Sequence, residues 1–202
     1  MEVAATLERD GFNLMALHIG SQSGTHVDSP YHFKNDGPRL EDCDLRSFVG
    51  RALIMDCTHL RAREPITWDV FSAYEAECAP PDPSGAPIVV LHTGWSERHW
   101  GTDRYFDHPY LEPGACARLL DSGVRTFAID AVNIDETRFD RNADFPCHQV
   151  ICGRGGIIAE NLTNLSAVDF ARPLISLLPI RLGGNADGAP CRAIAIEVLD
   201  RE

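Results

Sequence analysis

The stretch SQSGTHVDSPYH (residues 21–32) places two histidines and an aspartate within seven residues. On an extended strand, residues two apart point to the same face, roughly 7 Å from each other along the chain. His26 and Asp28 form such a pair, and Val27 between them would face the opposite, apolar side. The stretch therefore predicts a half-buried strand with titratable side chains on one face, followed by His32.

Two interpretations of this stretch remain open. An imidazole nitrogen and a carboxylate oxygen so spaced can converge on one ion, at about 2.0–2.2 Å from each. Gly24 allows the backbone to bend before the strand, and Pro30 turns the chain after it, which could bring His32 over the same face. The alternative is a hydrogen-bonded polar turn at a strand end, because isolated H-x-D pairs are common by chance. The spacing alone does not decide between a metal site and a polar turn.

A second cluster favours the metal site. His148 and Glu160 lie on either side of the turn GRGG (residues 153–156). We expect the histidine on a short helix and the glutamate on the following strand, so that they face each other if the turn folds back. Two imidazoles and two carboxylates form a donor set suited to zinc or manganese. Cys147 and Cys152 are expected to pack in the core rather than bind metal.

The remaining pattern predicts an α/β fold. Short apolar runs bounded by turn residues indicate buried strands at residues 51–57, 87–94 and 124–130. Helical spacing predicts helices at 67–78, with Thr67 as N-cap, and at 112–123, with Pro113 in the first turn and Gly123 beyond the end. Further strands are expected at 12–21, 157–160, 172–182 and 191–199, with a proline-rich loop at 79–87 and a turn at 183–190. We therefore expect one domain over residues 1–202, with a mixed β-sheet and flanking helices.

Composition narrows the function. The chain has 202 residues, 18 Lys and Arg against 30 Asp and Glu, and a formal charge of −12. An acidic chain without a basic cluster is poorly suited to nucleic acid or an anionic membrane, and no apolar run approaches the ~18 residues of a membrane span. The start, MEVAATLERDGFN, lacks the pattern of a signal peptide, and the seven cysteines contain no C-x-x-C pair. We expect reduced thiols and a cytoplasmic location.

The sequence resembles a known family at these motifs. The stretch SGTHVDSPYH is similar to the H-x-G-T-H-x-D-x-P-x-H signature of the cyclase family of metal-dependent hydrolases, which includes bacterial kynurenine formamidase and isatin hydrolase. Residues 89–130 resemble the family's central segment, and residues 148–165 resemble its later metal-binding segment. The resemblance covers most of the chain, from about Phe12 to Ile196, and implies a swivelling β/β/α fold, often assembled as a dimer or higher oligomer.

The resemblance also implies roles for individual residues. His26 and Asp28 match metal ligands, the aspartate being able to bridge two ions, and His148 and Glu160 match the later ligands. His32 matches the catalytic histidine, close to the metal but not bound to it. The implied ion is zinc, with manganese as the alternative, and one or two ions per chain.

One position departs from the family pattern. The first ligand histidine of the family falls at position 22, where this chain has Gln22. An amide oxygen is a neutral and weaker donor than an imidazole, so one metal position would be weakened, altered in preference or empty. His18 does not replace it, because four residues along a strand displace it by about 13 Å.

The resemblance implies a hydrolase that cleaves the C–N bond of a small amide, formamide or lactam, such as N-formylkynurenine or an isatin-like ring. Metal-activated water would attack the carbonyl, and His32 would transfer the proton to the leaving nitrogen. Trp95 follows a predicted strand end and could stack on a planar substrate, with ordinary packing as the alternative. Asp130 and Asp135 could orient a ligand histidine, or serve as helix caps and turn residues.

A second hypothesis is a family member with impaired catalysis that acts as a metal-dependent small-molecule binder or scaffold. Gln22 supports this hypothesis, and the presence of the other five site residues argues against it. A serine hydrolase is a poor match, because HTGWS (residues 92–96) lacks the G-x-S-x-G nucleophile elbow.

Overall fold

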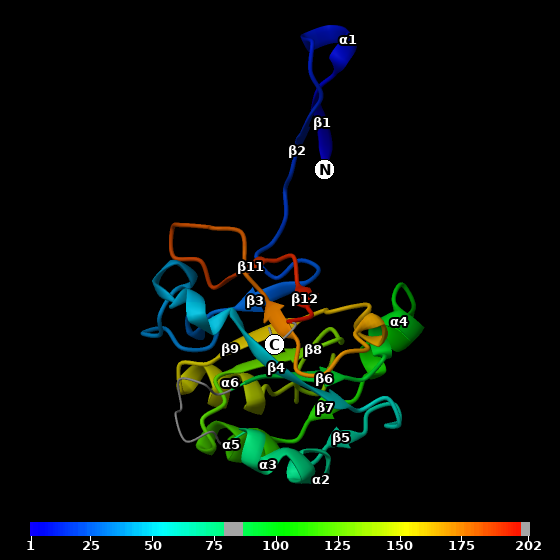
Figure 1. Cartoon of the computed structure of the whole chain (residues 1–202). Helices are drawn as coiled ribbons and strands as arrows, with labels where there is room; N and C mark the ends of the chain where they lie inside the picture. The colour runs from blue at the N-terminus through cyan, green and yellow to red at the C-terminus, as the bar shows by residue number, and fades with distance from the viewer. Residues whose placement is uncertain (79–86, 199–202) are drawn as a thin grey trace.

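The computed structural model describes residues 1–78 and 87–198 and is built around a mixed eight-stranded sheet (Figure 1). The strand order is β11–β3–β9–β8–β6–β4–β10–β12. In chain order the strands are β3 (His26–Asp28), β4 (Val49–Asp56), β6 (Ile88–His92), β8 (Thr126–Ile129), β9 (Ile157–Glu160), β10 (Leu174–Ser176), β11 (Gly188–Pro190) and β12 (Ile194–Ile196). Strands β4, β6, β8 and β9 run parallel, and the outer strands pair antiparallel. The predicted α/β class with a mixed sheet is confirmed.

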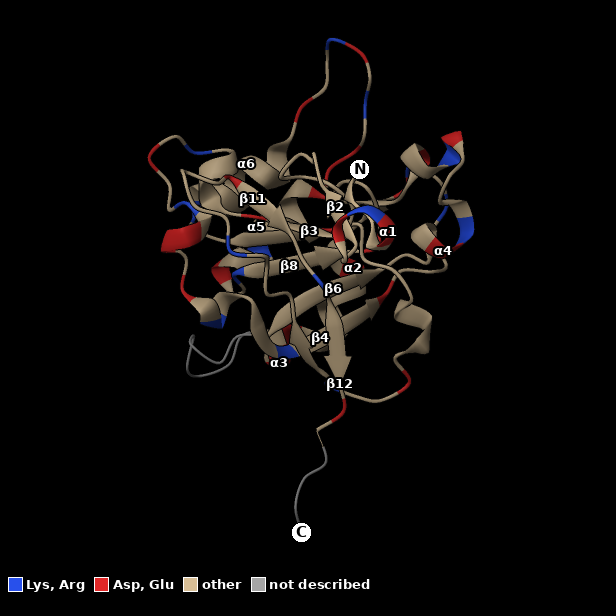
Figure 2. Cartoon of the chain, turned by 90° about the horizontal axis from the view of Figure 1, so that it is seen from above, with Lys and Arg blue, Asp and Glu red and all other residues tan. Residues whose placement is uncertain are grey.

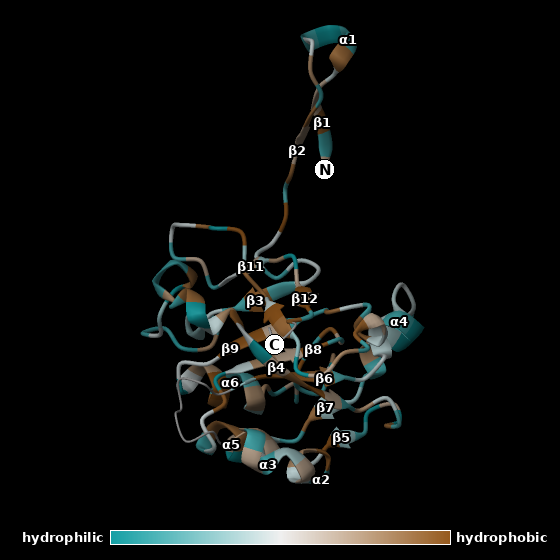
Figure 3. Ribbon diagram, viewed as in Figure 1, coloured by the Kyte–Doolittle hydropathy of each residue, from teal (hydrophilic) through white to brown (hydrophobic). Residues whose placement is uncertain are grey.

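The central strands are buried on both faces. Along β6, Val89 and Leu91 pack into one core cluster with side chains of α5 (Pro113–Asp121) and α6 (Pro146–Gly153). Ile88 and Val90 pack into a second cluster on the other face. A strand covered on both sides has no polar face, which explains the uninterrupted apolar run in the sequence. Figure 3 shows brown, apolar segments among the central strands, and Figure 2 shows that most of the charged residues lie on the outer helices and loops.

The helices are short and lie on the periphery. They are α1 (Leu7–Asp10), α2 (Trp68–Phe71), α3 (Glu75–Cys78), α4 (Trp95–His99), α5 and α6. Six 3₁₀ helices accompany them in the described residues: η1 (Pro30–His32), η2 (Leu40–Asp42), η3 (Leu45–Ser47), η4 (Ser72–Tyr74), η6 (Asp103–Asp107) and η7 (Leu165–Ala167). None of the helices within 1–78 and 87–198 is long and apolar enough to cross a membrane.

The helix expected over 112–123 is confirmed by α5, with Pro113 at its first position and Gly123 beyond its end at φ 107°. The helix expected over 67–78 is instead divided into α2, η4 and α3. Thr67 occupies the N-cap position of α2, but its side chain makes no capping hydrogen bond.

The outer strands are shorter than predicted. The expected strands at 12–21, 172–182 and 191–199 shrink to the three-residue strands β2 (Leu14–Ala16), β10 and β12. Strand β11 forms inside the segment predicted as a turn, and β1 (Glu2–Ala5) and α4 were not predicted. A minor sheet pairs β5 (Pro65–Ile66) with β7 (Tyr110–Leu111). The expected loop at 79–87 lies, apart from Pro87, outside the described residues.

The N-terminal segment forms an arm, defined here as residues 1–20. Strand β1 pairs antiparallel with β2, with α1 at the tip of the hairpin, and the arm projects away from the body of the molecule (Figure 1). Large apolar side chains on the arm are exposed by 49 to 87%: Met1, Val3, Leu7, Phe12, Leu14, Met15, Leu17 and Ile19. The arm thus carries much apolar surface that the rest of the chain does not cover.

Candidate metal centre and active site

The antiparallel pairing of β3 with β9 builds the floor of the site. His26 lies directly opposite Glu160 in this pairing, and Asp28 follows two residues further on the same face. The Nε2 atom of His26 lies 3.5 Å from Asp28 Oδ1 and 3.6 Å from Glu160 Oε2. Val27 faces the other side and is fully buried in the second core cluster. The predicted alternation along the strand is therefore confirmed.

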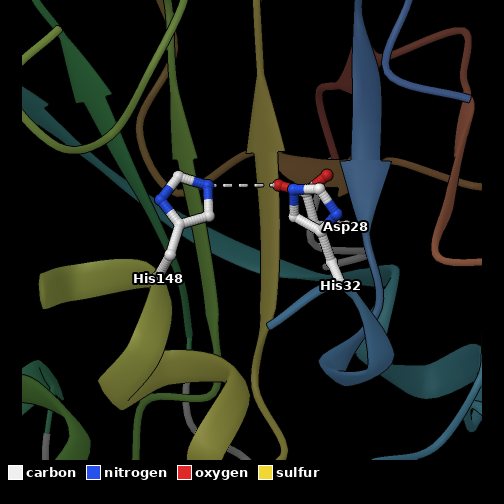
Figure 4. Close-up of side chains that lie close together, drawn as sticks. All are labelled: Asp28, His32 and His148. Carbon is white, nitrogen blue, oxygen red and sulfur yellow. Dashed lines mark ion pairs between the residues drawn. The ribbon is translucent and has the colours of Figure 1, made fainter. Parts of the chain in front are cut away.

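Helix α6 brings His148 to the same point. Asp135 accepts hydrogen bonds from the backbone N–H groups of Cys147 (2.8 Å) and His148 (3.0 Å), which fixes the start of the helix. The same carboxylate lies 2.8 Å from His148 Nδ1. The other ring nitrogen, Nε2, then lies 3.5 Å from Asp28 Oδ2 (Figure 4). The same nitrogen lies 3.4 Å from Glu160 Oε1. Asp135 thus orients the histidine and caps the helix, which are the two roles that the sequence left open.

The glycine-rich turn lets the chain return from α6 into β9. Gly155 has φ 75°, in the left-handed region that favours glycine. A Cβ on Gly156 would lie 2.7 Å from the carbonyl oxygen of Arg125, so only glycine fits there without a shift. The expected meeting of His148 with Glu160 across this turn is confirmed.

The electrostatics of the cluster favour a positive charge between its side chains. His26 Nδ1 lies 2.8 Å from the carbonyl oxygen of Gly24, which can only accept a hydrogen bond. The hydrogen of the neutral ring therefore belongs on Nδ1, and the lone pair on Nε2 faces the carboxylates. Burial raises the pKa of Glu160 above its ordinary value, although His148 opposes this. Burial alone would lower the pKa of His148, but the hydrogen bond to Asp135 and the nearby charges of Glu160 and Asp28 raise it overall.

A divalent cation fits this cluster. Asp28 is 1% exposed, and neither of its carboxylate oxygens has a hydrogen-bond partner within the described part of the chain. Unpaired acceptors that face other acceptors are costly unless a proton or cation lies between them. The structure offers two overlapping ligand groups that share Asp28: one with His26 and Glu160, the other with His32 and His148. Nitrogen and oxygen donors without a thiol suit zinc or manganese.

His32 lies beside this cluster as the last residue of η1, two residues after Pro30. Its Nδ1 atom lies 3.0 Å from Asp187 Oδ2, and its ring centroid is 6.0 Å from that of His148. Gln22 donates from Nε2 to the same Asp187 oxygen at 3.0 Å. Asp187 therefore links Gln22, which precedes β3 in the chain, with His32, which follows it.

A cavity of about 380 Å³ opens over the cluster. Its lining includes Gln22, His26, His32, His148 and Glu160, together with the aromatic rings of Phe33 and Phe145. A neighbouring cavity of about 510 Å³ shares Gln22, Val132 and Asn161 with it and adds a second aromatic wall: Trp100, Tyr105 and Phe106. The two cavities together form a cleft with the titratable cluster at one end and aromatic rings along its walls.

Trp95 does not line either cavity. It is 3% exposed, donates from its indole nitrogen to the Arg104 carbonyl oxygen at 3.0 Å, and packs against His99. The structure therefore favours the packing alternative for this residue. Trp100, five residues later and 66% exposed, stands at the cleft instead.

Several site residues were not found from the sequence. Asp187 lies in the segment predicted as a turn, and nothing in its neighbourhood marked it as a partner of His32. The aromatic wall lies between α4 and β7, where no periodic pattern pointed to a cleft. Asp130, by contrast, accepts from the backbone N–H groups of Thr93 and Gly94 in the turn before α4, which supports the turn role among the alternatives predicted for it.

Comparison with known proteins identifies the family of the chain. The Cyclase family model, "Putative cyclase", matches residues 2–136. A Bacillus mycoides protein named kynurenine formamidase is 30% identical, and the match covers 96% of this chain and 85% of the relative. A kynurenine formamidase of Geobacillus thermodenitrificans is also 30% identical, over 92% of this chain and 81% of the relative. The chain belongs to the cyclase family.

The fold is shared with solved structures. Isatin hydrolase A from Ralstonia solanacearum superimposes with a TM-score of 0.83 at 20% identity, over 97% of this chain and 81% of that one. The β/β/α architecture expected from the family resemblance is therefore confirmed.

Proposed function

We propose that the protein is a metal-dependent hydrolase that cleaves the C–N bond of a small amide, formamide or lactam. The observation that carries this proposal is the buried Asp28, whose two unpaired oxygens lie between two imidazoles and a second carboxylate. The similarity to proteins named kynurenine formamidase, over nearly the whole chain, supports the same class of reaction.

The proposed ligands are His26, Asp28, His148 and Glu160. Asp28 is able to serve two ions because one of its oxygens faces His26 and the other faces His148. We propose zinc, with manganese as the alternative, at one or two ions per chain. When bound, such an ion would polarise the substrate carbonyl and lower the pKa of water.

His32 is the proposed acid and base. Because its Nδ1 faces Asp187, the proton of the neutral ring belongs on Nδ1, and Nε2 is free to accept one. In the proposed reaction Nε2 takes a proton from the attacking water and gives it to the leaving nitrogen. The carboxylate of Asp187 holds the ring in place and stabilises the imidazolium between these two transfers.

The walls of the cleft favour a flat, aromatic substrate. Phe33 and Phe145 lie beside the cluster, and Trp100 and Phe106 lie in the adjoining cavity. Aromatic rings bind planar ligands by stacking and by edge contacts. We therefore propose an aryl amide or a fused lactam, with N-formylkynurenine and isatin as the first compounds to assay.

We also propose that the chain assembles as a homodimer or higher oligomer through its arm, and that it acts in the cytoplasm. A two-stranded hairpin alone is only marginally stable in water, and a concentration of exposed apolar side chains marks an interaction surface. The arm is a two-stranded hairpin, and it carries many exposed apolar side chains. The seven cysteines are free thiols, five of them buried, which is consistent with a reducing compartment.

The test is turnover of both compounds by metal-loaded protein, for wild type and His32→Ala. We expect His32→Ala to lower kcat by about 10²–10⁴-fold, the usual contribution of a general acid or base, with the metal content unchanged. The matched control is His59→Ala, which removes an exposed imidazole outside the cleft. Full activity in His32→Ala would contradict the assigned role. Metal and compound binding without any turnover would instead favour the impaired, small-molecule-binding alternative.

A further inference from the structure

Buried acceptor oxygens without donors gather at the cleft. Within the described residues, four buried side-chain atoms lack a hydrogen-bond partner: Gln22 Oε1, Asp28 Oδ1, Asp28 Oδ2 and Arg39 Nε. Three of these are oxygens, and both residues that carry them belong to the site. A buried carbonyl oxygen without a donor costs about 1–3 kcal/mol. Gln22 therefore shares with Asp28 the feature that points to a bound cation.

The orientation of the Gln22 amide is fixed by its neighbours. Its Nε2 donates to Asp187 Oδ2 at 3.0 Å, so the oxygen of the planar amide is turned away from Asp187. Gly188 makes room for this arrangement, because a Cβ there would lie 2.7 Å from Gln22 Nε2 and 2.4 Å from the Val27 carbonyl oxygen. Gly188 pairs with Asp28 across β11 and β3. The amide thus lies against the backbone beside the proposed bridging ligand.

We propose that Gln22 is an oxygen ligand of the metal centre and that Asp187 is the positioning residue that holds its amide. This inference rests on the proposed function, which supplies the ion. Gln22 stands on the wall of the cavity that also contains His26 and Glu160. The donor set at this position then has an amide oxygen where the family pattern has an imidazole nitrogen. Oxygen donors favour harder ions, so the substitution shifts the preference from zinc towards manganese.

The test measures binding of Mn²⁺ and Zn²⁺ by competition with a chelator, which needs no substrate. We expect Gln22→Ala to lower the Mn²⁺ affinity by about 10–100-fold, and Asp187→Asn, which does not touch the ion, by about 10-fold. In a Gln22→Ala background, Asp187→Asn should have little further effect, because two residues that act through one contact are not additive. Gln22→His should raise the affinity for Zn²⁺ relative to Mn²⁺ by about 10-fold. Asp36→Asn, which removes an exposed carboxylate from the loop after η1, is the matched control and should change neither affinity.

The outcomes separate this inference from the proposed function. Wild type that binds ions while Gln22→Ala binds them equally well would overturn the inference and leave the hydrolase proposal intact. An Asp187→Asn loss of equal size in both backgrounds would overturn the positioning role. Wild type that binds neither ion would overturn the proposed function, and the inference with it.

Discussion

Asp135 offers a sharp test of how the site is built, because it joins the fold to the proposed ligand His148. The carboxylate is 1% exposed and accepts from two backbone N–H groups at the start of α6, besides facing His148 Nδ1. In Asp135→Asn one carboxylate oxygen becomes an NH₂ donor. In either orientation of the new amide, one of the two buried N–H groups loses its acceptor.

The expected magnitudes follow from these contacts. A buried N–H without an acceptor lowers the free energy of unfolding by about 1–3 kcal/mol. The charged acceptor of His148 Nδ1–H is also lost, and the removal of such an outer partner of a ligand histidine weakens metal binding by about 10–100-fold. We therefore expect Asp135→Asn to be less stable in chelator and to bind Zn²⁺ or Mn²⁺ more weakly.

Urea unfolding in excess chelator measures the first effect, and chelator competition on the folded protein measures the second. The matched control is Asp144→Asn, which removes an exposed carboxylate beside the N-terminus of α6 without contact to His148. Wild-type affinity in Asp135→Asn, or an equal loss of affinity in both variants, would refute the orienting role.

Three further predictions follow from other parts of the molecule. Removal of the ion should lower the free energy of unfolding by about 4 kcal/mol, compared with protein at a free ion concentration of 1,000 times Kd. Thermal unfolding with and without chelator should show this difference in wild type, and Asp28→Asn should abolish it. An unchanged transition in wild type would contradict a metal centre. His108 is buried between the Pro109 carbonyl oxygen and the Thr137 hydroxyl, and burial lowers its pKa to about 4. Because the folded pKa lies below the ordinary 6.5, this histidine stabilises the fold fully above pH 6.5, and about 3 kcal/mol of the free energy of unfolding should be lost as the pH falls through 4. Urea unfolding should show a shallower pH dependence of this free energy in His108→Gln than in wild type. The same pH dependence in both proteins would contradict the assignment. Deletion of residues 1–17 should convert the proposed oligomer into monomers in sedimentation velocity, because it removes most of the exposed apolar arm. An unchanged mass would exclude this part of the arm as the interface.

The sequence predicted most reliably what the sheet itself determines. The period-2 alternation of His26, Val27 and Asp28 correctly placed two polar side chains on one face and an apolar one in the core. The apolar runs of β4, β6 and β8 were equally clear, because strands buried on both faces leave no ambiguity about their environment. The helix around His148 and the glycine turn to Glu160 followed from local signals as well.

What the sequence did not reveal depends on contacts between distant segments. Asp187 is 155 residues from His32 and 165 from Gln22, and no local pattern records either hydrogen bond. The aromatic Trp95 and Trp100 could not be told apart from the sequence, because packing against α4 and η6 decides which ring is covered and which reaches the cleft. Strand β11 has only three residues and exists because β3 pairs with it.

Residues placed by the register of the sheet and residues placed by contacts between distant segments differ in how freely they can be substituted. A slip of β3 by one residue against β9 would turn His26 and Asp28 into the second core cluster and bring Val27 into the cleft. The proposed ligands on the sheet are therefore fixed by the same register that buries the core. Gln22 lies before the strand, and its side chain is held by a hydrogen bond to Asp187. A side chain held in this way can be exchanged without disturbing the register, so the departure from the family pattern at position 22 is compatible with the fold.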